Sequence, residues 1–257
     1  MQLKKATCHT SSIRHRISIQ KNLLSKFNNI IKNLVQKKKA FGGRNATGRI
    51  TVRHKGGGCK KKMHNFFFKQ NYLALVVKTM YNANSNSFVS LNFDLNKKVF
   101  FKTYAVRNIF SGFLVKSCTY LKDVKLGYRT NLKSLPAGTI VCSVFLKNNL
   151  KFARSAGSFC QIIEKKQHEI KLKLPSGILI QVPSSSFATL GTIDNAEQKQ
   201  VVKGKAGFSR LKGIRPSVRG VAMNPVDHPH GGKSNKGMPP VTPWGLPTKG
   251  KPTVKKN

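Results

Sequence analysis

Residues 170–182 read IKLKLPSGILIQV, and this stretch decides the class of fold. Residues 170–174 alternate strictly between apolar side chains and lysine, which is the pattern of a half-buried β-strand. The Pro-Ser-Gly sequence at residues 175–177 is a turn signal, and residues 178–182 form a second apolar run. The stretch therefore predicts two short strands separated by a turn.

The same succession of short strands and turns extends back through the middle of the chain. Further strands are predicted at residues 72–79, 88–93, 99–104, 139–146 and 159–163. Turn signals separate them at residues 82–86, 112, 136–138 and 148–149. Many short strands with frequent turns predict a mainly β fold, built as small barrels or a sandwich. The turn at 136–138 is the best boundary between two small units.

The two ends of the chain differ from this middle in charge and composition. The chain of 257 residues carries 48 Lys and Arg against 7 Asp and Glu, a formal net charge of +41. Residues 1–62 hold 17 basic residues and no acid, and residues 198–257 hold 13 basic residues, one acid and 17 Gly or Pro. We therefore expect a folded middle with long, basic, irregular N- and C-terminal extensions. Such a charge favours a polyanionic partner, and nucleic acid is the commonest one.

Other classes of protein fit this composition poorly. The longest apolar run, residues 73–77, is far shorter than the ~20 residues that a membrane span needs. No apolar segment of a secretory signal follows the early lysines. The five cysteines are odd in number and widely spaced, which predicts free thiols in a reducing compartment.

Apolar residues recur at helical spacing in residues 22–35, with lysines between them. This pattern predicts a basic amphipathic helix. One interpretation is an organelle-targeting or membrane-surface helix. The other, which we favour, is a helix that packs on the chain's own barrel or on a neighbour.

Residues 42–58 alternate arginine with glycine and include Arg44, Arg49, Arg53, His54 and Lys55. Glycine lets backbone N–H groups approach a phosphate, and arginine supplies a bidentate donor. The segment is not a phosphate-binding loop of the nucleotide-hydrolase kind, because the Gly-Lys-Ser/Thr ending is missing. A flexible basic linker is the alternative.

Two further basic segments suggest phosphate contacts. Residues 150–158 place Arg154 and Ser155 between predicted strands, although an ordinary turn explains them equally well. Residues 204–250 contain basic residues that are spaced by loops rather than by a helix face: Lys205, Arg210, Arg215, Arg219 and Lys249. The only tryptophan, Trp244, lies in this segment, where it would either stack on a base or hold the extension onto its own barrel.

His228 and His230 raise two sharper possibilities. A metal site wants three or four ligands, and apart from Asp227 no acid or cysteine lies nearby in the sequence; an approach of Cys59 to His64 is not required by anything in the pattern. Catalysis by histidine would normally bring an orienting carboxylate and a nucleophile or metal. We therefore predict no metal, and histidines that donate to phosphates or to the backbone of a rigid Pro/Gly loop.

At this point the chain resembles one family, the universal large-subunit ribosomal proteins numbered two in the bacterial nomenclature. The segments that carry the resemblance are residues 43–58, 153–157, 188–191 with 195–197, and 204–250. The run at 222–232, followed by Pro-Trp-Gly at 243–245 and Thr-Lys-Gly at 248–250, is highly specific. The likeness weakens at residues 64–130, and before residue 42 it is faint and confined to residues 6–16.

The resemblance implies an oligonucleotide-binding-type barrel followed by an SH3-like barrel. We expect residues 1–62 to be the N-terminal extension, 63–135 the first barrel, 136–200 the second barrel and 201–257 the C-terminal extension. The implied partners are large-subunit rRNA, neighbouring ribosomal proteins and the small subunit across the subunit interface. The implied role is structural, in assembly, subunit association and the architecture near the peptidyl-transferase centre.

The resemblance also implies that rRNA carries the chemistry, so we expect no enzyme, cofactor, small-molecule substrate or membrane contact. The predicted rRNA-binding residues are Arg44, Arg49, Arg53, His54, Lys55, Arg154, Ser155, Lys205, Arg210, Arg215, Arg219, Asn224, His228, His230, Trp244 and Lys249.

The composition bears on origin. The chain holds 37 Lys against 11 Arg, with 20 Asn and 16 Phe, a bias that an AT-rich genome produces. We therefore expect a mitochondrial ribosomal protein, encoded in the organelle; a plastid or a bacterial ribosome is the alternative.

Two functions from other classes fit the sequence less well. A metal- or histidine-dependent nuclease needs a cluster of acids or metal ligands, which seven scattered acids do not supply. A chromatin-like DNA-binding protein would normally show a recognition helix or zinc-ligand spacing, and the sequence shows neither.

Overall fold

The computed structural model describes residues 3–20, 24, 33–66, 71–120, 123–146, 149–232 and 238–249. The chain divides into two compact units. Unit 1 comprises residues 1–39 and 59–208, and unit 2 comprises residues 40–58 and 209–257. The mainly β fold predicted from the sequence is confirmed, since the described α-helical structure is one six-residue helix, α1 (Ala206–Leu211).

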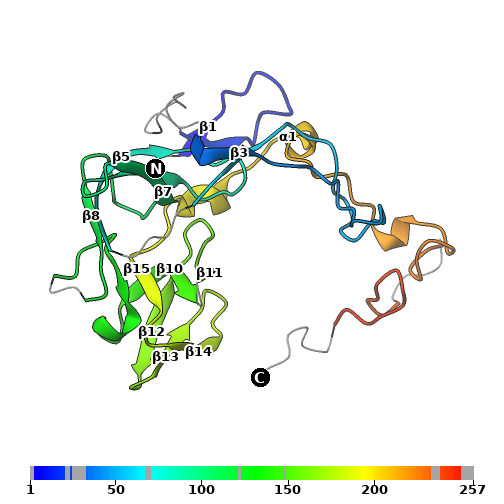
Figure 1. Cartoon of the computed structure of the whole chain (residues 1–257). Coiled ribbons are helices and arrows are strands. Elements are labelled where there is room, and N and C mark those ends of the chain that lie inside the picture. The colour runs from blue at the N-terminus through cyan, green and yellow to red at the C-terminus, as the bar shows by residue number, and fades with distance from the viewer. Residues whose placement is uncertain are drawn as a thin grey trace. The chain divides into compact units, whose positions relative to one another are not determined.

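Unit 1 contains a continuous, strongly curved sheet of eleven strands (Figure 1). The first group of strands is β5 (Tyr72–Met80), β6 (Val89–Asp94), β7 (Val99–Tyr104) and β8 (Leu114–Ser117). They lie in the order β8-β5-β6-β7 and pair antiparallel. The inward side chains of β5 alternate with outward ones, as a half-buried strand requires.

The second group continues the same sheet in the order β14-β13-β12-β10-β15-β9, with β11 paired to β10. Its members are β9 (Arg129–Asn131), β10 (Ile140–Leu146), β11 (Asn149–Phe152), β12 (Cys160–Lys165), β13 (Glu169–Lys173), β14 (Leu179–Pro183) and β15 (Phe187–Leu190). The stretch that opened the sequence analysis is the β13–β14 hairpin, in which Leu172 faces Ile180 across the pair. Gly177 closes its turn at φ 86°.

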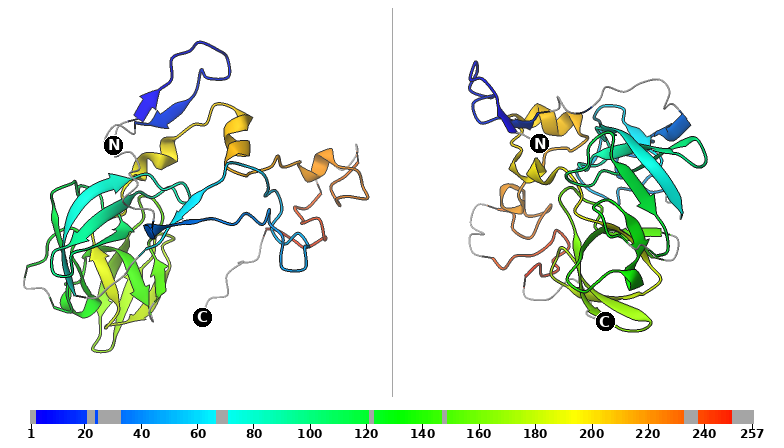
Figure 2. Two further views of the ribbon diagram at one scale, coloured as in Figure 1. Left: turned by 45° about the horizontal axis from the view of Figure 1, so that its top comes forward. Right: turned by 90° about the vertical axis from the view of Figure 1, so that its left-hand side faces the viewer.

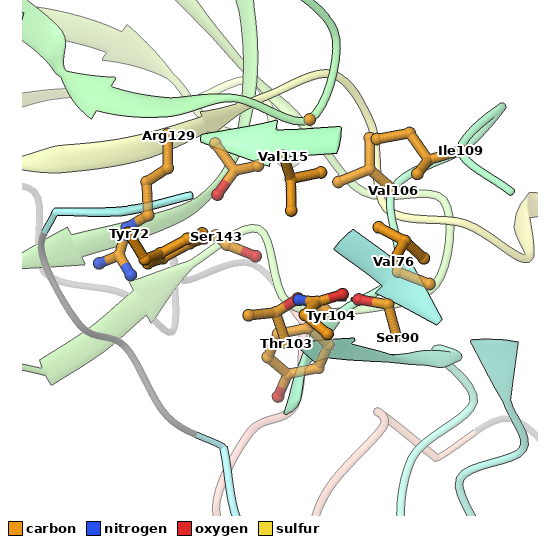
Figure 3. Close-up of a pocket in the computed structure, with 14 residues that line it drawn as sticks. Tyr72, Val76, Ser90, Thr103, Tyr104, Val106, Ile109, Val115, Arg129 and Ser143 are labelled. Carbon is orange, nitrogen blue, oxygen red and sulfur yellow. Dashed lines mark hydrogen bonds between the residues drawn. The ribbon is translucent and has the colours of Figure 1, made fainter. Parts of the chain in front are cut away.

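Each group of strands has its own buried cluster. The first is built on Tyr72, Ala74, Val76, Phe101 and Val115. The second is larger and includes Leu132, Leu135, Val141, Val144, Ile162, Ile170, Leu172 and Ile193. A small cavity of about 30 Å³ lies beside the first cluster, with Ser90, Thr103, Arg129 and Ser143 on its wall (Figure 3). That volume admits water but not a nucleotide.

Short strands and helices complete the described chain. The N-terminal part forms two ribbons, β1 (Leu3–Lys5) with β2 (Ile17–Ile19) and β3 (Val35–Lys37) with β4 (Lys62–His64) (Figure 2). The 3-10 helices are η2 (Leu132–Ser134), η3 (Ala196–Gln200) and η4 (Gly220–Ala222). Within the residues described, no helix is long and apolar enough to cross a membrane.

Of the amphipathic helix predicted at residues 22–35, the structure describes only residues 24 and 33–35. Residues 21–23 and 25–32 lie outside the described residues. Val35, the last residue of the prediction, lies in strand β3 rather than in an α-helix, so the prediction was wrong at this end. The reason is tertiary pairing: Val35 is held opposite His64 of β4.

The two extensions are not independent of each other. Residues 40–58 run beside residues 209–222 in unit 2 (Figure 1). The pairing includes an isolated bridge between Lys55 and Ile214 and hydrogen bonds from Gly56 N–H to Gly213 O (3.1 Å) and from Arg215 N–H to His54 O (3.0 Å). Segments about 160 positions apart therefore satisfy each other's backbone groups.

Candidate RNA-binding surface

The structure leaves most of the predicted contact residues open to solvent. His54 and His230 are half-buried, and His228 is buried. Exposed are Arg44, Arg49, Arg53, Lys55, Arg154, Ser155, Lys205, Arg210, Arg215, Arg219, Asn224, Trp244 and Lys249. No acidic partner within salt-bridge distance is found for these arginines and lysines among the described residues.

The Gly-rich part of unit 2 is ordered by close backbone contacts. Gly58 has φ +90°, and a Cβ placed there would lie 2.6 Å from the amide nitrogen of Gly213. Gly43 has φ +79°, and its Cβ would lie 2.2 Å from the carbonyl oxygen of Val52. Glycine is required at both positions because no side chain fits. These two close contacts argue against the flexible basic linker that was the alternative for residues 42–58.

A small loop at residues 43–52 displays Arg44 and Arg49. The side-chain oxygen of Asn45 accepts hydrogen bonds from the backbone N–H groups of Thr47 (3.1 Å) and Arg49 (3.0 Å). The carbonyl of Gly43 accepts from the N–H groups of residues 51 and 52. The guanidinium of Arg44 donates through Nη1 to the carbonyl of Gly42 at 2.6 Å, while that of Arg49 is exposed. The loop is thus held by its own hydrogen bonds and presents Arg49, with the rest of the Arg44 guanidinium, at the surface. No sequence pattern singled out Asn45.

His54 and Trp244 have structural contacts inside unit 2. The Nδ1–H of His54 donates to the carbonyl of Pro216 at 3.1 Å. The guanidinium of Arg53 lies 5.9 Å from the centroid of the Trp244 ring, at the outer limit of a cation–π contact. Trp244 is nevertheless 74% exposed, so one ring face stays accessible for stacking. The contact that holds Trp244 is with residues 40–58 rather than with a barrel.

His228 forms the interior of the loop at residues 222–232. It is only 7% exposed, and its Nδ1 accepts a hydrogen bond from the backbone N–H of His230 at 3.0 Å. The neutral ring therefore carries its proton on Nε2. A Cβ at Gly220 would lie 2.7 Å from the ring, so the glycine lets the chain close over the histidine. We expected His228 to donate to the backbone or to phosphate. In the structure its ring is mostly enclosed, and its Nδ1 accepts a hydrogen bond from the backbone.

The outer surface of the same loop carries different residues. Val226 is 90% exposed and Asn224 is exposed, while the carbonyl of Asn224 accepts from the N–H groups of Asp227 (3.0 Å) and His228 (3.3 Å). The Nε2 of His230 lies 2.9 Å from the carbonyl oxygen of Pro239. The loop is therefore a folded turn around an imidazole, with Val226 at its exposed tip. Val226 was missed by the sequence analysis, since an isolated valine carries no functional signal.

Unit 1 places Arg154 and Ser155 at an open groove of about 450 Å³. The groove is lined by Ser85, Asn86, Tyr104, Arg154, Ser155, Ala156, Gln198 and Lys199. Residues 155–158 are indeed a turn, closed by a hydrogen bond from Ser158 N–H to Ser155 O (3.0 Å). Gly157, at φ +69°, packs against Ala196 too closely for any side chain. The turn predicted as one interpretation is therefore present, and it places Arg154 on the wall of the groove, while the phosphate contact of Arg154 stays a prediction.

One wall of the groove is aromatic. The Tyr104 ring stacks on Phe66 with centroids 4.3 Å apart and planes inclined by 12°. Burial raises the pKa of the Tyr104 hydroxyl, and the positive charge of Arg154 acts in the opposite direction. The phenol is therefore a neutral hydrogen-bond donor at pH 7, beside the cations of Arg154 and Lys199. Sequence reasoning missed Tyr104 and Lys199 because they come from segments about 50 residues on either side of Arg154.

In the described part of the chain, the thiols and histidines do not form a group that could hold a metal ion. All five cysteines are free. Burial raises the pKa of the Cys142 thiol to about 12 and that of Cys160 to about 11, so both are protonated and unreactive at neutral pH. No three His, Cys, Asp or Glu side chains among these residues come close enough to hold a metal ion.

Comparison with known proteins gives the family. Residues 31–107 match the model of the RNA-binding N-terminal domain of ribosomal proteins L2, and residues 125–245 match that of their C-terminal domain. The large ribosomal subunit protein uL2 of Ehrlichia chaffeensis is 41% identical over 266 aligned positions, covering 100% of this chain and 95% of that protein. The protein uL2m of Reclinomonas americana is 41% identical over 265 aligned positions, with the same coverage. The uL2 of a Wolbachia from Brugia malayi is 44% identical over 236, covering 88% of this chain and 85% of that protein.

These alignments cover more of the chain than the sequence motifs did. They include the first 41 residues, where the sequence showed only a faint likeness. The two matched domains agree with an oligonucleotide-binding-type barrel for the first strand group and an SH3-like barrel for the second. On this match, which spans its whole length, the chain belongs to the L2 family of ribosomal proteins.

Proposed function

We propose that this chain is a structural constituent of the large ribosomal subunit that binds large-subunit rRNA. The observation that carries the proposal is the exposure of the arginines and lysines predicted to bind rRNA. These side chains have no acidic partner within salt-bridge distance among the described residues, and the backbone that presents them is held by its own hydrogen bonds. The names of the relatives, large ribosomal subunit proteins, support the same role.

The mode of binding follows from charge and geometry. A net charge of +41 attracts the phosphate backbone, and each phosphate contact releases counterions, so affinity falls steeply with salt. Arginines bind a phosphate through two parallel N–H donors. Because the loops at residues 43–52 and 222–232 are held in place by their own backbone hydrogen bonds, little ordering entropy opposes these contacts.

The finer role extends to three partners. We infer contacts with rRNA, with neighbouring ribosomal proteins and with the small subunit across the subunit interface. We further infer support of assembly, of subunit association and of the architecture near the peptidyl-transferase centre. The folded loop at 222–232, with its exposed tip at Val226, supports a contact of this kind. We also propose the division of the chain into an N-terminal extension (residues 1–62), two barrels (63–135 and 136–200) and a C-terminal extension (201–257). The sixteen residues named in the sequence analysis are the proposed contacts with rRNA.

We propose a mitochondrial ribosome as the location. The Lys-rich, Asn-rich and Phe-rich composition supports it, and so does the likeness to the uL2m of Reclinomonas americana. Several of the similar relatives are bacterial, which keeps a bacterial or plastid ribosome as the alternative. Locating the gene in an organellar or a nuclear genome, and the protein in purified organelles, decides between them.

The proposed function is tested by binding of the full chain to large-subunit rRNA at increasing salt. If roughly 6–10 phosphates are neutralised, affinity falls by about 10³–10⁵ between 50 and 200 mM salt. A flat response would contradict the electrostatic argument. Incubation of the RNA with metal or chelator tests the nuclease, since a nuclease shortens the RNA. Competition by duplex DNA tests the chromatin-like alternative, which predicts that DNA displaces rRNA at equal phosphate concentration.

A further inference from the structure

The described residues cover only part of the outer face of the first barrel's sheet. The ribbon β3–β4 and its flanks cover the part near the start of β6, where Leu34 and Phe66 pack on Met80, Val89 and Leu91. Beside them the ammonium group of Lys102 donates to the carbonyl of Leu34 at 3.1 Å. This side of the sheet is therefore closed by the chain's own N-terminal segment.

The other part of the same face carries a continuous row of apolar side chains. In the sheet Leu114 stands opposite Leu75, Leu75 opposite Phe93, and Phe93 opposite Phe100. Directly opposed residues project from the same face, so the row crosses all four strands, β8, β5, β6 and β7. Leu114 is 50% exposed and Phe100 is 38% exposed. The Phe93 and Phe100 rings lie 4.9 Å apart and are inclined by 50°.

Lysines border this row. At the end of β6 the Asp94 carboxylate points inward and accepts hydrogen bonds from the N–H groups of Asn96 (3.0 Å) and Lys97 (3.3 Å). The turn that results brings Lys97 and Lys98 to the surface just before β7, and Lys98 adopts φ 54°. On β8, Lys116 is exposed two positions after Leu114, on the same face. Cations therefore stand at two edges of an apolar surface, while the Asp94 carboxylate at the end of β6 is turned inward.

We propose that this row, Leu114–Leu75–Phe93–Phe100, is a stacking platform for unpaired bases of a single-stranded rRNA segment, with Lys97, Lys98 and Lys116 beside its phosphates. Single-stranded RNA presents an apolar ring face and a negative charge in every repeating unit, which is the combination that this surface complements. A protein partner would need to bring its own acids to the same edges. The inference rests on the proposed rRNA-binding function and adds an unpaired segment as its target.

The first test replaces the rings while keeping apolar bulk. The full chain carrying Phe93→Leu and Phe100→Leu is compared with wild type for binding to a single-stranded oligouridine and to a blunt RNA duplex with the same number of phosphates. Salt of about 0.3 M suppresses purely ionic binding. We expect single-strand affinity to fall roughly 5- to 100-fold, as the loss of a base–aromatic stack predicts, and duplex affinity to change less than twofold. Phe159→Leu, at a phenylalanine that is 43% exposed elsewhere in unit 1, is the matched control.

The second test reports directly from the row. Phe100→Trp is introduced into a Trp244→Phe background, so that the new indole is the only tryptophan, and the Trp244→Phe chain is the reference. Oligouridine is expected to quench the indole emission, and the duplex to leave it unchanged.

Two results would overturn the proposal. One is an unquenched indole, with unchanged single-strand affinity of the leucine variant, while wild type still binds large-subunit rRNA; a protein surface is then the occupant of the row. The other is an equal loss of single-strand and duplex affinity. Failure of the wild-type chain to bind rRNA at all would instead refute the proposed function, so the two failures are distinguishable.

Discussion

Lys102 is a fully buried cation whose replacement tests the packing of the N-terminal ribbon. Its side chain is 0% exposed, and its ammonium group donates to Leu34 O at 3.1 Å and to Nδ1 of His64 at 3.2 Å. Burial, with a smaller effect of the charge on Lys78, lowers the pKa of Lys102 from 10.5 to about 8. Burial and the Lys102 charge also lower the pKa of His64, which keeps its ring neutral and able to accept.

The direction of the pH dependence follows from this shift. Between pH 8 and pH 10.5 the unfolded chain holds the Lys102 proton and the folded chain releases it, so the free energy of unfolding rises with pH through this window. The full shift corresponds to about 3 kcal/mol. Screening by salt and water near the ribbon reduces this, and we expect a gain of ~1–3 kcal/mol.

The assay compares wild type with Lys102→Met by urea unfolding at several pH values from 7 to 10.5. Urea is used because it adds no ions to a chain of net charge +41. Methionine keeps the bulk of the side chain but removes its charge. As the pH rises from 8 to 10.5, the unfolding free energy of wild type should therefore increase by ~1–3 kcal/mol relative to that of Lys102→Met. Lys173→Met, at an exposed position of β13, should give a constant difference. Parallel curves for Lys102→Met and wild type would refute the reasoning.

Four further outcomes are expected. Arg215→Ala should weaken rRNA binding by ~1.5–3 kcal/mol in a filter assay, because an exposed guanidinium that binds phosphate through charge-assisted hydrogen bonds is lost; unchanged affinity would mean that it stays in water. Gly58→Ala should cost about 2 kcal/mol or more and speed hydrogen exchange in residues 40–58, since a Cβ there meets backbone at 2.6 Å; normal protection would contradict the close contact. Cys142 and Cys160 should resist a thiol reagent in the native chain at pH 7 and react only after unfolding, as their raised pKa values and burial require. His228→Ala should loosen its loop and reduce translation more than subunit assembly; equal loss of both would make the histidine merely architectural.

Local periodicity predicted the strands with the strongest patterns. β7 occupies the predicted residues 99–104, and β5 and β10 differ from their predicted ranges by one residue at one end. Strands β8, β9, β11 and β15 were missed, because runs of three or four residues carry too little alternation. Their pairing is decided by partners distant in sequence, as in the single parallel pair of Ser117 with Arg129.

The candidate site was predictable in its chemistry but not in its geometry. Arginine alternating with glycine identified the loop at 43–52, and the structure exposes Arg44 and Arg49 there. No local pattern could show that residues 40–58 pair with residues 209–222, because that pairing depends on contacts between distant segments. The same limit explains His228. Its sequence neighbours predicted a histidine that donates to phosphate or to the backbone of a rigid loop, but they could not show that the close approach of Gly220 buries its ring inside that loop.

Sedimentation of the native protein tests the central claim most directly. An extract is fractionated on a sucrose gradient at moderate salt, and the amount of this chain is measured against large-subunit rRNA in each fraction. A structural rRNA-binding constituent is expected to co-sediment with large subunits at one copy per rRNA and to remain after a high-salt wash. Recovery of the chain in fractions free of rRNA would contradict the account, and would turn attention to the nuclease and DNA-binding alternatives.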